Sequence, residues 1–196
     1  RGKPVIGLTK EDFEIYEDGV LQEIKYLSSD PVPLSVVIAV DQSGSLKEFF
    51  KDVKKAGWLA LNALPPSDEI AIVGFDNEVR ISTNFTTNRQ EIDAVLRKML
   101  NTGGGTNITI ALRHSIEELK KTGGLRRKVI LFISDNYHSV SNVEHLNRVP
   151  FSEKDKIGES VIRNEIIVYN IKLGAALSNT DPASADSGEE LIRSLV

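Results

Sequence analysis

Apolar and polar positions along this chain form alternating blocks of two kinds. Largely apolar runs, typical of strands buried on both faces, occupy residues 34–40, 69–75, 128–134 and 165–172. Apolar residues spaced three and four positions apart, typical of helices with one buried face, occupy residues 46–64, 88–99, 108–119 and 153–163. A further strand is expected over residues 78–83, because the tight turn Asp76-Asn77 makes it an antiparallel neighbour of the strand before it.

This alternation of strands and helices predicts an α/β fold. The expected architecture is a doubly wound, mostly parallel sheet with one antiparallel edge strand and helices on both faces, as in Rossmann-like folds. Residues 137–152 are polar and weakly patterned, and a short helix is favoured only over residues 143–148. Residues 173–187 are small and polar and are expected to be mobile, so the last helix is expected to begin at Gly188.

The first part of the chain predicts a small N-terminal β-hairpin. Thr9 before acidic residues favours one turn of helix. Asp18-Gly19 is a strong hairpin turn between two short alternating segments. Residues 28–33 have the composition of a linker, so we expect a hairpin extension over residues 1–30 and a main domain over residues 31–196.

Composition narrows the classes of function. The chain has 196 residues, 40% of them apolar, which is enough for one domain with a sizeable core. Its formal charge of −4 provides no positive field for nucleic acid or an anionic bilayer, and no apolar stretch is long enough to span a membrane. The absence of cysteine excludes disulfides, thiolate zinc sites and a cysteine nucleophile. His114, His138 and His145 are expected to be solvated rather than to bind zinc.

Side chains with oxygen atoms gather where the predicted strands end. Asp41, Ser43 and Ser45 follow the first buried strand, Thr106 follows a run of glycines, and Asp135 follows a later strand. Because the carboxyl ends of parallel strands lie at one edge of a sheet, we expect these residues to converge there. Two carboxylates and three hydroxyls suit a small divalent cation, Mg²⁺ or alternatively Mn²⁺ or Ca²⁺. A cation held mainly by neutral hydroxyls stays electron-poor and favours a carboxylate from outside as its last ligand.

Three short motifs resemble the metal-ion-dependent adhesion site (MIDAS) of von Willebrand factor A-type (vWA) domains: Asp41-Gln-Ser43-Gly-Ser45, Gly104-Gly105-Thr106 and Ser134-Asp135. The resemblance covers the chain from about Pro33 to its end. It implies a non-enzymatic adhesion or protein-interaction module with the vWA fold. Its final strand is expected to follow Val196.

The resemblance also implies a role for each candidate residue. Ser43, Ser45 and Thr106 would touch the metal, Asp41 would bind it directly or through water, and Asp135 would act through water. An Asp or Glu of a protein partner would complete the coordination shell.

One departure concerns the last motif, in which the aspartate of the family is often followed by Gly. Here Asn136 follows Asp135, so the shape of this loop and the role of Asp135 are open.

The leader also resembles the segment before the vWA domain in a bacterial vWA-related group, through these motifs: Gly7-Leu8-Thr9, Asp12-Phe13 and Glu17-Asp18-Gly19. Many members of that group carry export signals. The resemblance therefore implies an extracellular, periplasmic or cell-surface location.

Two alternatives stay open from the residues themselves. In one, the metal only stabilises the loops and binding occurs through the hairpin or residues 137–152. In the other, the domain is a Mg²⁺-dependent phosphohydrolase with Asp41 as nucleophile. That chemistry usually needs a second acid two residues later, where this chain has Ser43. A phosphate-binding P-loop is disfavoured because no Lys-Ser/Thr follows Gly105.

Overall fold

The computed structural model describes the chain except for residues 1–4, 6, 26, 28–31, 140–150 and 174–181. The chain divides into two compact units, Arg1–Pro31 and Val32–Val196. The helix expected over residues 143–148 lies outside the described residues.

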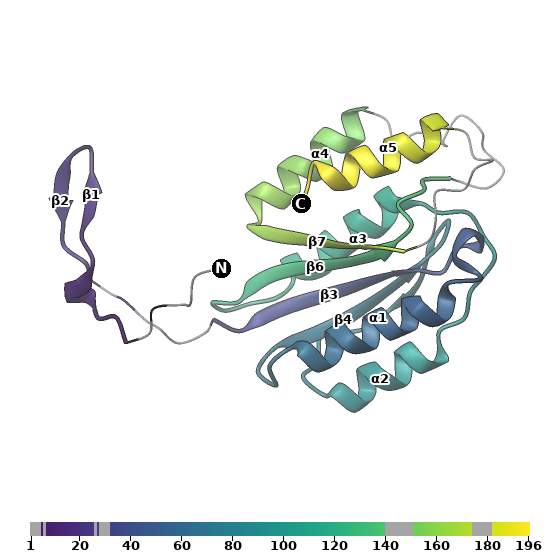
Figure 1. Cartoon of the computed structure of the whole chain (residues 1–196), viewed down its shortest axis with the longest axis horizontal. Helices are drawn as coiled ribbons and strands as arrows, with labels where there is room; N and C mark the ends of the chain where they lie inside the picture. The colour runs from purple at the N-terminus through teal and green to yellow at the C-terminus, as the bar shows by residue number, and fades with distance from the viewer. Residues whose placement is uncertain (1–4, 6, 26, 28–31, 140–150, 174–181) are drawn as a thin grey trace. The chain divides into compact units, whose positions relative to one another are not determined.

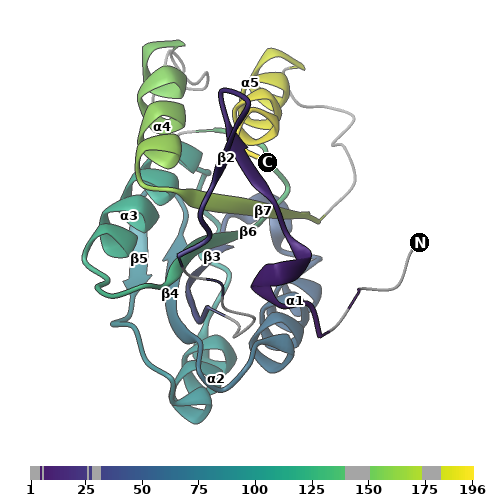
Figure 2. The ribbon, with the colours of Figure 1, turned by 90° about the vertical axis from the view of Figure 1, so that its left-hand side faces the viewer.

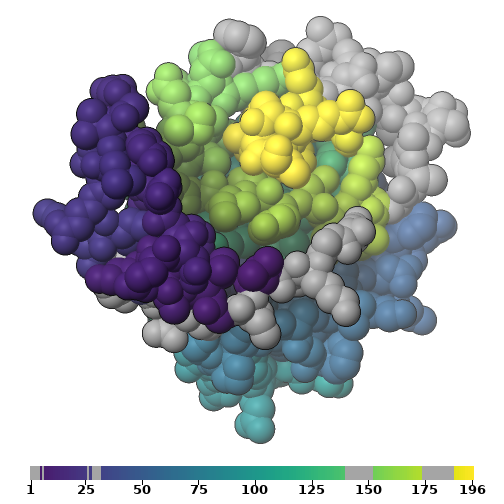
Figure 3. Space-filling view, turned by 60° about the vertical axis from the view of Figure 1, so that its left-hand side comes forward, coloured from purple at the N-terminus to yellow at the C-terminus, as the bar shows by residue number. Residues whose placement is uncertain are grey.

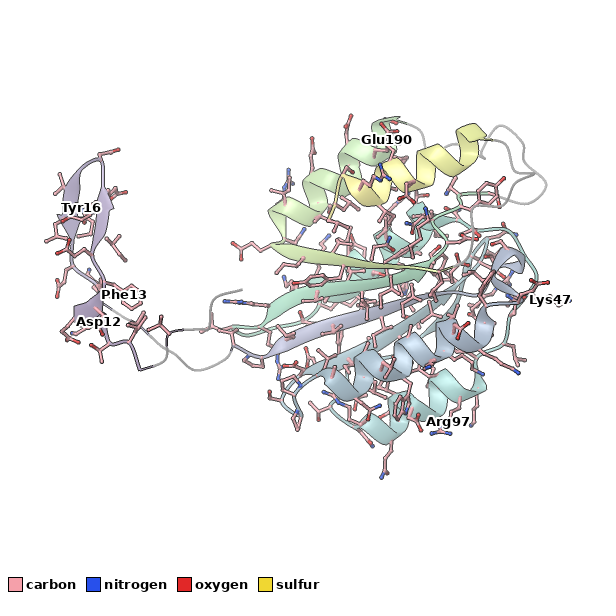
Figure 4. All side chains as sticks on the ribbon, in the orientation of Figure 1. Asp12, Phe13, Tyr16, Lys47, Arg97 and Glu190 are labelled. Carbon is pink, nitrogen blue, oxygen red and sulfur yellow. The ribbon has the colours of Figure 1, made fainter. Side chains whose placement is uncertain are left out.

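The first unit contains the expected helical turn and hairpin. A short 3₁₀ helix, η1 (Lys10–Asp12), precedes strands β1 (Ile15–Glu17) and β2 (Val20–Gln22), which pair antiparallel. The turn between the strands has positive φ at both Asp18 and Gly19, as tight hairpin turns require. Phe13 and Tyr16 are exposed on this unit (Figure 4).

The second unit is built on a sheet of five strands in the order β5-β4-β3-β6-β7 (Figure 1). The strands are β3 (Leu34–Asp41), β4 (Glu69–Phe75), β5 (Val79–Ser82), β6 (Arg127–Ser134) and β7 (Ile166–Lys172). All neighbouring pairs are parallel except β4 and β5, which are antiparallel. The predicted mixed sheet with one antiparallel edge strand is therefore confirmed.

Helices cover both faces of this sheet, as Figures 1 and 2 show. Helices α1 (Phe50–Ala63) and α2 (Arg89–Lys98) lie on one face; α3 (Ile108–Lys120), α4 (Phe151–Arg163) and α5 (Pro182–Arg193) lie on the other. Alternate residues of β3 serve the two cores: Ile38 packs on the α1 side and Val37 on the α3 side, and both are fully buried. This two-sided burial is the reason that β3 is apolar without interruption from Val36 to Val40.

The strand register aligns the carboxyl ends of the three central strands. Asp41 at the end of β3 is paired with Phe75 at the end of β4, and Val40 is paired with Ile133 of β6. The residues that follow these strands therefore emerge at the same edge of the sheet. Lys47, soon after β3, lies at that end of the unit in Figure 4.

Two element boundaries differ from the expectations. Helix α5 begins at Pro182, six residues before the predicted start at Gly188, so residues 182–187 are helical and the prediction for them was wrong. Proline is favoured at the first position of a helix because its φ is already helical. Helix α1 begins at Phe50, because a separate 3₁₀ turn, η2 (Gly44–Leu46), follows the first motif.

The carboxy-terminal part of the unit forms one side of the domain. β7 is the last strand of the sheet, and the space-filling view shows α5 in yellow above the yellow-green surface of β7 (Figure 3). Glu190 of α5 is paired with Lys154 of α4 (Figure 4). Among the described residues, no helix is both long and apolar enough to cross a membrane.

Candidate metal centre

Asp41 is fixed by two neighbouring strand ends. Its side chain is fully buried. Its Oδ1 accepts a hydrogen bond from the backbone N–H of Ser43 at 2.9 Å, and its Oδ2 accepts one from the Ser134 hydroxyl at 2.6 Å. The first bond folds the chain after β3 back onto Asp41, and the second joins β3 to β6.

The two serines of the first motif face each other. The Ser43 and Ser45 hydroxyl oxygens are 3.0 Å apart, although one residue separates them in sequence. Ser43 is extended, and the η2 turn that follows it brings Ser45 back to the same side. Ser45 also interacts with the side chain of Asp135 and lowers the pKa of that carboxyl, against the effect of burial. The structure thus brings Asp41, Ser43, Ser45 and Asp135 into one connected cluster.

A second loop, residues 99–107, connects α2 to α3 and is named the Thr106 loop here. It lies against the first motif: the Gly44 N–H donates to the Gly104 carbonyl at 2.8 Å, and the Thr102 N–H donates to the Gln42 carbonyl at 2.8 Å. Gly103 has a φ of +74°, a conformation that suits glycine. These bonds place Thr106, the last residue of the second motif, in the loop that contacts the first motif.

Thr106 has a buried hydroxyl without a protein partner. The residue is 1% exposed, and its Oγ1 makes no hydrogen bond within the part of the chain that the structure describes. Its backbone pairs with that of Ser139. A buried hydroxyl without a partner is costly, and such groups in native structures usually have a role or an additional ligand. The Thr106 oxygen therefore fits a metal ion at this place.

The third motif is held by the turn after β6. Asp135 accepts a hydrogen bond from the Tyr137 N–H at 2.9 Å. Asn136 is buried, with a φ of +64°, and its side-chain amide donates to Glu189 of α5 at 3.2 Å. Asparagine tolerates this left-handed conformation better than most residues do. The loop therefore adopts a backbone shape that suits the usual glycine, and Asn136 adds a contact with α5.

Electrostatics at the cluster favour a cation. Burial, followed by the nearby charge of Asp135, raises the pKa of Asp41 to about 7, against hydrogen bonds from Ser134 and Ser43 that lower it. Burial also raises the pKa of Asp135 above its ordinary value. Two buried carboxylates that are costly to ionise together gain from a positive ion between them.

The donor set consists of two carboxylates and three hydroxyls. Within the described part of the chain there is no group of three or more His, Asp or Glu side chains that could hold a metal. A metal at this cluster would therefore depend on neutral hydroxyl oxygens, a donor type that hard cations such as Mg²⁺ accept.

The sequence analysis did not identify the part played by Asp76. This carboxylate, read only as part of a turn, is 1% exposed and contacts the Thr106 loop through Thr102 at 2.7 Å. Burial raises its pKa, but hydrogen bonds from Glu78, Thr102 and Arg80 outweigh that effect and leave the pKa below its ordinary value. The signal in the sequence was its position, because Asp76 directly follows β4 as Asp41 ends β3.

The prediction for the histidines was wrong at His138. This residue is 3% exposed, and its Nδ1 accepts a hydrogen bond from the Ile108 N–H at 3.3 Å. The ring thus provides a hydrogen-bond acceptor for a backbone N–H in the first turn of α3. No spacing in the sequence indicates this role. His114 contacts the Ser82 hydroxyl at 2.8 Å, and His145 lies outside the described residues.

Comparison with solved structures finds the same fold in bacterial proteins. An aerotolerance-related membrane protein from Bacteroides fragilis aligns with a TM-score of 0.60 at 15% identity, over 82% of this chain and 87% of that one. BatB from Bacteroides thetaiotaomicron aligns with a TM-score of 0.62 at 14% identity, over 82% and 86%. The pilus adhesin SpaC from Lactobacillus rhamnosus GG aligns with a TM-score of 0.64 at 16% identity, over 84% of this chain but only 27% of the adhesin.

Sequence comparison identifies the family directly. A comparison with curated proteins found no match. The family model of the von Willebrand factor type A domain, however, matches residues 36–138, more than half of the chain, from β3 through the turn after β6. This range contains all five candidate residues. The chain belongs to the von Willebrand factor type A domain family.

Proposed function

We propose that this chain is a metal-dependent protein-interaction module of the adhesion type. In this proposal, a divalent cation, Mg²⁺ or alternatively Mn²⁺ or Ca²⁺, is held by Asp41, Ser43, Ser45, Thr106 and Asp135. The carboxylate of a partner's Asp or Glu completes the site. Residues 31–196 form the vWA domain in this proposal, and residues 1–30 form its hairpin extension.

The observation that carries the proposal is the buried, unpartnered hydroxyl of Thr106. The Ser43 and Ser45 hydroxyls hydrogen-bond to each other, and Asp41 accepts a hydrogen bond from the Ser43 N–H. The Thr106 loop is joined to this motif through Gly44 and Gly104. Thr106 Oγ1 alone among the five side chains lacks a partner while being buried. A hard cation would provide a partner for this hydroxyl oxygen, and its positive charge would stabilise the ionised forms of the two carboxylates.

The proposed partner chemistry follows from the charge of the donor set. A bound cation would supply Lewis acidity toward an oxygen anion from outside. The hydroxyls of Ser43, Ser45 and Thr106 add no negative charge, and Asp41 already uses both oxygens for hydrogen bonds within the protein. With these ligands, the bound cation would keep a strong preference for a further carboxylate from outside the domain.

The similarity to known structures supports an interaction role outside the cytoplasm. The fold is shared with a pilus adhesin and with an aerotolerance-related membrane protein. We propose an extracellular, periplasmic or cell-surface location for this bacterial-type domain.

We propose a binding role rather than an enzymatic one. A phosphohydrolase with Asp41 as its nucleophile would usually need a second acid two residues later in the chain. The position for a second acid is occupied by Ser43, a hydroxyl with no acid chemistry near neutral pH.

The first test is calorimetric titration of Mn²⁺ into EDTA-treated protein. Ser43→Ala removes a proposed ligand, and we expect saturable binding by the wild type that this variant loses. Ser115→Ala is the matched control, because Ser115 is also buried but bonds only to the Ala111 carbonyl of its own helix. Equal binding by all three proteins would refute the proposed ligand set. Unfolding of Ser43→Ala without metal would favour a structural role for the site.

The second test addresses the partner carboxylate. Bound Mn²⁺ that keeps an open position relaxes the protons of exchanging water, and a carboxylate that takes this position lowers the relaxation rate. We expect acetate to lower the rate for the Mn²⁺-loaded wild type, whereas acetamide, which has no charge, leaves it unchanged. A rate that acetate does not alter would contradict carboxylate binding while leaving metal binding intact.

A further inference from the structure

Asp76 follows β4 at the same sheet edge as the candidate metal centre, but it is not one of the proposed ligands. We infer that Asp76 is a positioning residue: it holds the Thr106 loop where the Thr106 hydroxyl reaches the cation. This inference rests on the proposed function and assigns to the site a residue beyond the five motif positions.

The Asp76 carboxylate is buried and fully engaged. Its Oδ1 accepts hydrogen bonds from the Glu78 N–H at 2.9 Å and from Arg80 Nε at 2.8 Å. Its Oδ2 lies 2.9 Å from the same Arg80 nitrogen and accepts a hydrogen bond from the Thr102 hydroxyl at 2.7 Å. Burying a charge is costly unless it is paired in this way, so the contact with Thr102 is held by a rigid group.

Asp76 forms hydrogen bonds with the Thr106 loop at two points. Its side chain binds Thr102 near the start of the loop, and its backbone carbonyl accepts the Asn107 N–H at 2.7 Å at the end of the loop. Thr106 lies between these two points. Fixing both sides of a short segment restricts the positions that Thr106 can occupy.

The middle of the loop also passes close to the Asp76 carboxylate. A Cβ added to Gly104 would lie 3.2 Å from Asp76 Oδ2, so a glycine allows this approach. The carbonyl of the same Gly104 accepts the Gly44 N–H on the other side. The loop is therefore held between Asp76 after β4 and the first motif after β3.

Asp76→Asn tests this role because it keeps the shape of the side chain but removes the charge that pairs with Arg80. We expect it to weaken Mn²⁺ binding about tenfold or more, as is typical when a group that orients a metal ligand is lost. Thr102→Val is a second variant that leaves the Asp76–Arg80 pair in place and removes the Thr102 hydroxyl, which contacts both the Asp76 carboxylate and the Gln42 carbonyl. We expect Thr102→Val to weaken binding in the same direction.

A matched control is present on α2. Asp93 and Arg97 form an ion pair at 2.6 Å with the same spacing of four residues as Asp76 and Arg80. Asp93→Asn removes an ion-paired carboxylate from α2, where the side chain is 28% exposed against 1% for Asp76, so we expect it to leave Mn²⁺ binding unchanged. A loss in Asp93→Asn equal to that in Asp76→Asn would overturn the inference.

A double-mutant cycle separates positioning from general destabilisation. If Asp76 acts through Thr106, Asp76→Asn should weaken Mn²⁺ binding clearly in the wild type but by less than about twofold in the Thr106→Ala background. An equal loss in both backgrounds would overturn the inference, because Asp76 would then act independently of Thr106.

Amide hydrogen exchange in EDTA gives a readout that needs no metal. We expect Asp76→Asn to increase exchange at Asn107 and Gly44, whose N–H groups bond to Asp76 and to the loop. Exchange in β3 should stay unchanged. Unchanged protection at Asn107 and Gly44 would overturn the inference. If the wild type binds no Mn²⁺, the proposed function fails, and the exchange result still decides whether Asp76 orders the loop.

Discussion

The Gly44 N–H donates to the Gly104 carbonyl at 2.8 Å, and this bond, together with the bond from the Thr102 N–H to the Gln42 carbonyl, joins the two loops that carry candidate metal ligands. The approach depends on the lack of a side chain at Gly44. A Cβ there would lie 3.0 Å from the Gly103 carbonyl oxygen and 3.2 Å from its carbon. Backbone atoms cannot rotate away as a flexible side chain does, so a Cβ at residue 44 would require the Gly103 backbone to shift by a few tenths of an ångström.

Gly44→Ala is therefore expected to separate the loops and weaken both stability and metal binding. We expect a loss of about 1–3 kcal/mol in the free energy of unfolding, as for other substitutions that overpack a close contact. Urea unfolding and Mn²⁺ calorimetry provide the measurements. Gly123→Ala is the control, since an added Cβ at Gly123 meets nothing within 4 Å. Equal behaviour of the two variants would show that the close contact has no energetic role.

Ser134→Ala is expected to disturb the site without removing a proposed ligand. Ser134 donates to Asp41 Oδ2 at 2.6 Å and accepts the Asn136 N–H at 3.0 Å, so the variant leaves both groups unsatisfied. We expect a loss of about 1–3 kcal/mol of stability and about tenfold weaker Mn²⁺ binding. Ser115→Ala should lose stability but keep its Mn²⁺ affinity. If Ser134→Ala binds Mn²⁺ as tightly as the wild type does, this hydroxyl has no orienting role.

The raised pKa of Asp41 predicts a distinctive pH dependence in metal-free protein. An acid whose pKa is about 7 in the folded state and near its ordinary value when unfolded binds more protons in the folded state between these values. The free energy of unfolding should therefore fall as pH rises toward 7 and level off above it. Mg²⁺ should reduce this dependence, because it favours the ionised carboxylate.

The contribution of Asp41 is isolated by measuring the free energy of unfolding in EDTA over pH 5 to 8. The values for Asp41→Asn are subtracted from those for the wild type. Asp76 and Glu189 have lowered pKa values, so their stabilising contributions are lost only at more acidic pH. Asp135 also has a raised pKa, so it too makes the free energy of unfolding fall as pH rises. The subtraction removes only part of this contribution from Asp135. A wild-type curve that rises with pH toward 7 after this subtraction would contradict the assignment.

The contact between α5 and the turn after β6 predicts opposite effects at two helical glycines. A Cβ at Gly188 would lie 2.2 Å from the Asn136 carbonyl oxygen, whereas a Cβ at Gly158 in α4 meets nothing within 4 Å. Gly188→Ala should destabilise the domain, and Gly158→Ala should stabilise it by about 0.5–1 kcal/mol through helix propensity. Thermal unfolding of both variants measures this contrast, and an increase in stability for Gly188→Ala would contradict the close packing.

The sheet and its order of elements followed from the sequence because each buried strand is an uninterrupted apolar run, as in β3 and β4. The convergence of the first motif with Asp135 also followed, since parallel strands end at one edge. The start of α5 at Pro182 did not follow, because small polar residues there carry no clear apolar spacing.

The sequence pattern did not predict contacts between segments that lie far apart in the chain. Asn136 was recognised as a departure from the family motif, but its bond to Glu189 depends on how α5 packs against the turn after β6. The Asp76–Thr102 contact likewise depends on the path of the Thr106 loop. Such contacts arise from tertiary packing, which composition and periodicity do not encode directly.

The most direct test of the metal centre is the pair of measurements on Thr106→Val, unfolding in EDTA and Mn²⁺ binding. Since Thr106 Oγ1 is buried without a hydrogen-bond partner, its removal should leave metal-free stability unchanged or raise it by about 1 kcal/mol. The same variant should lose most of its Mn²⁺ affinity. Thr102→Val should instead lose metal-free stability, because its hydroxyl has partners. A Thr106→Val protein that binds Mn²⁺ as the wild type does would contradict the proposed centre.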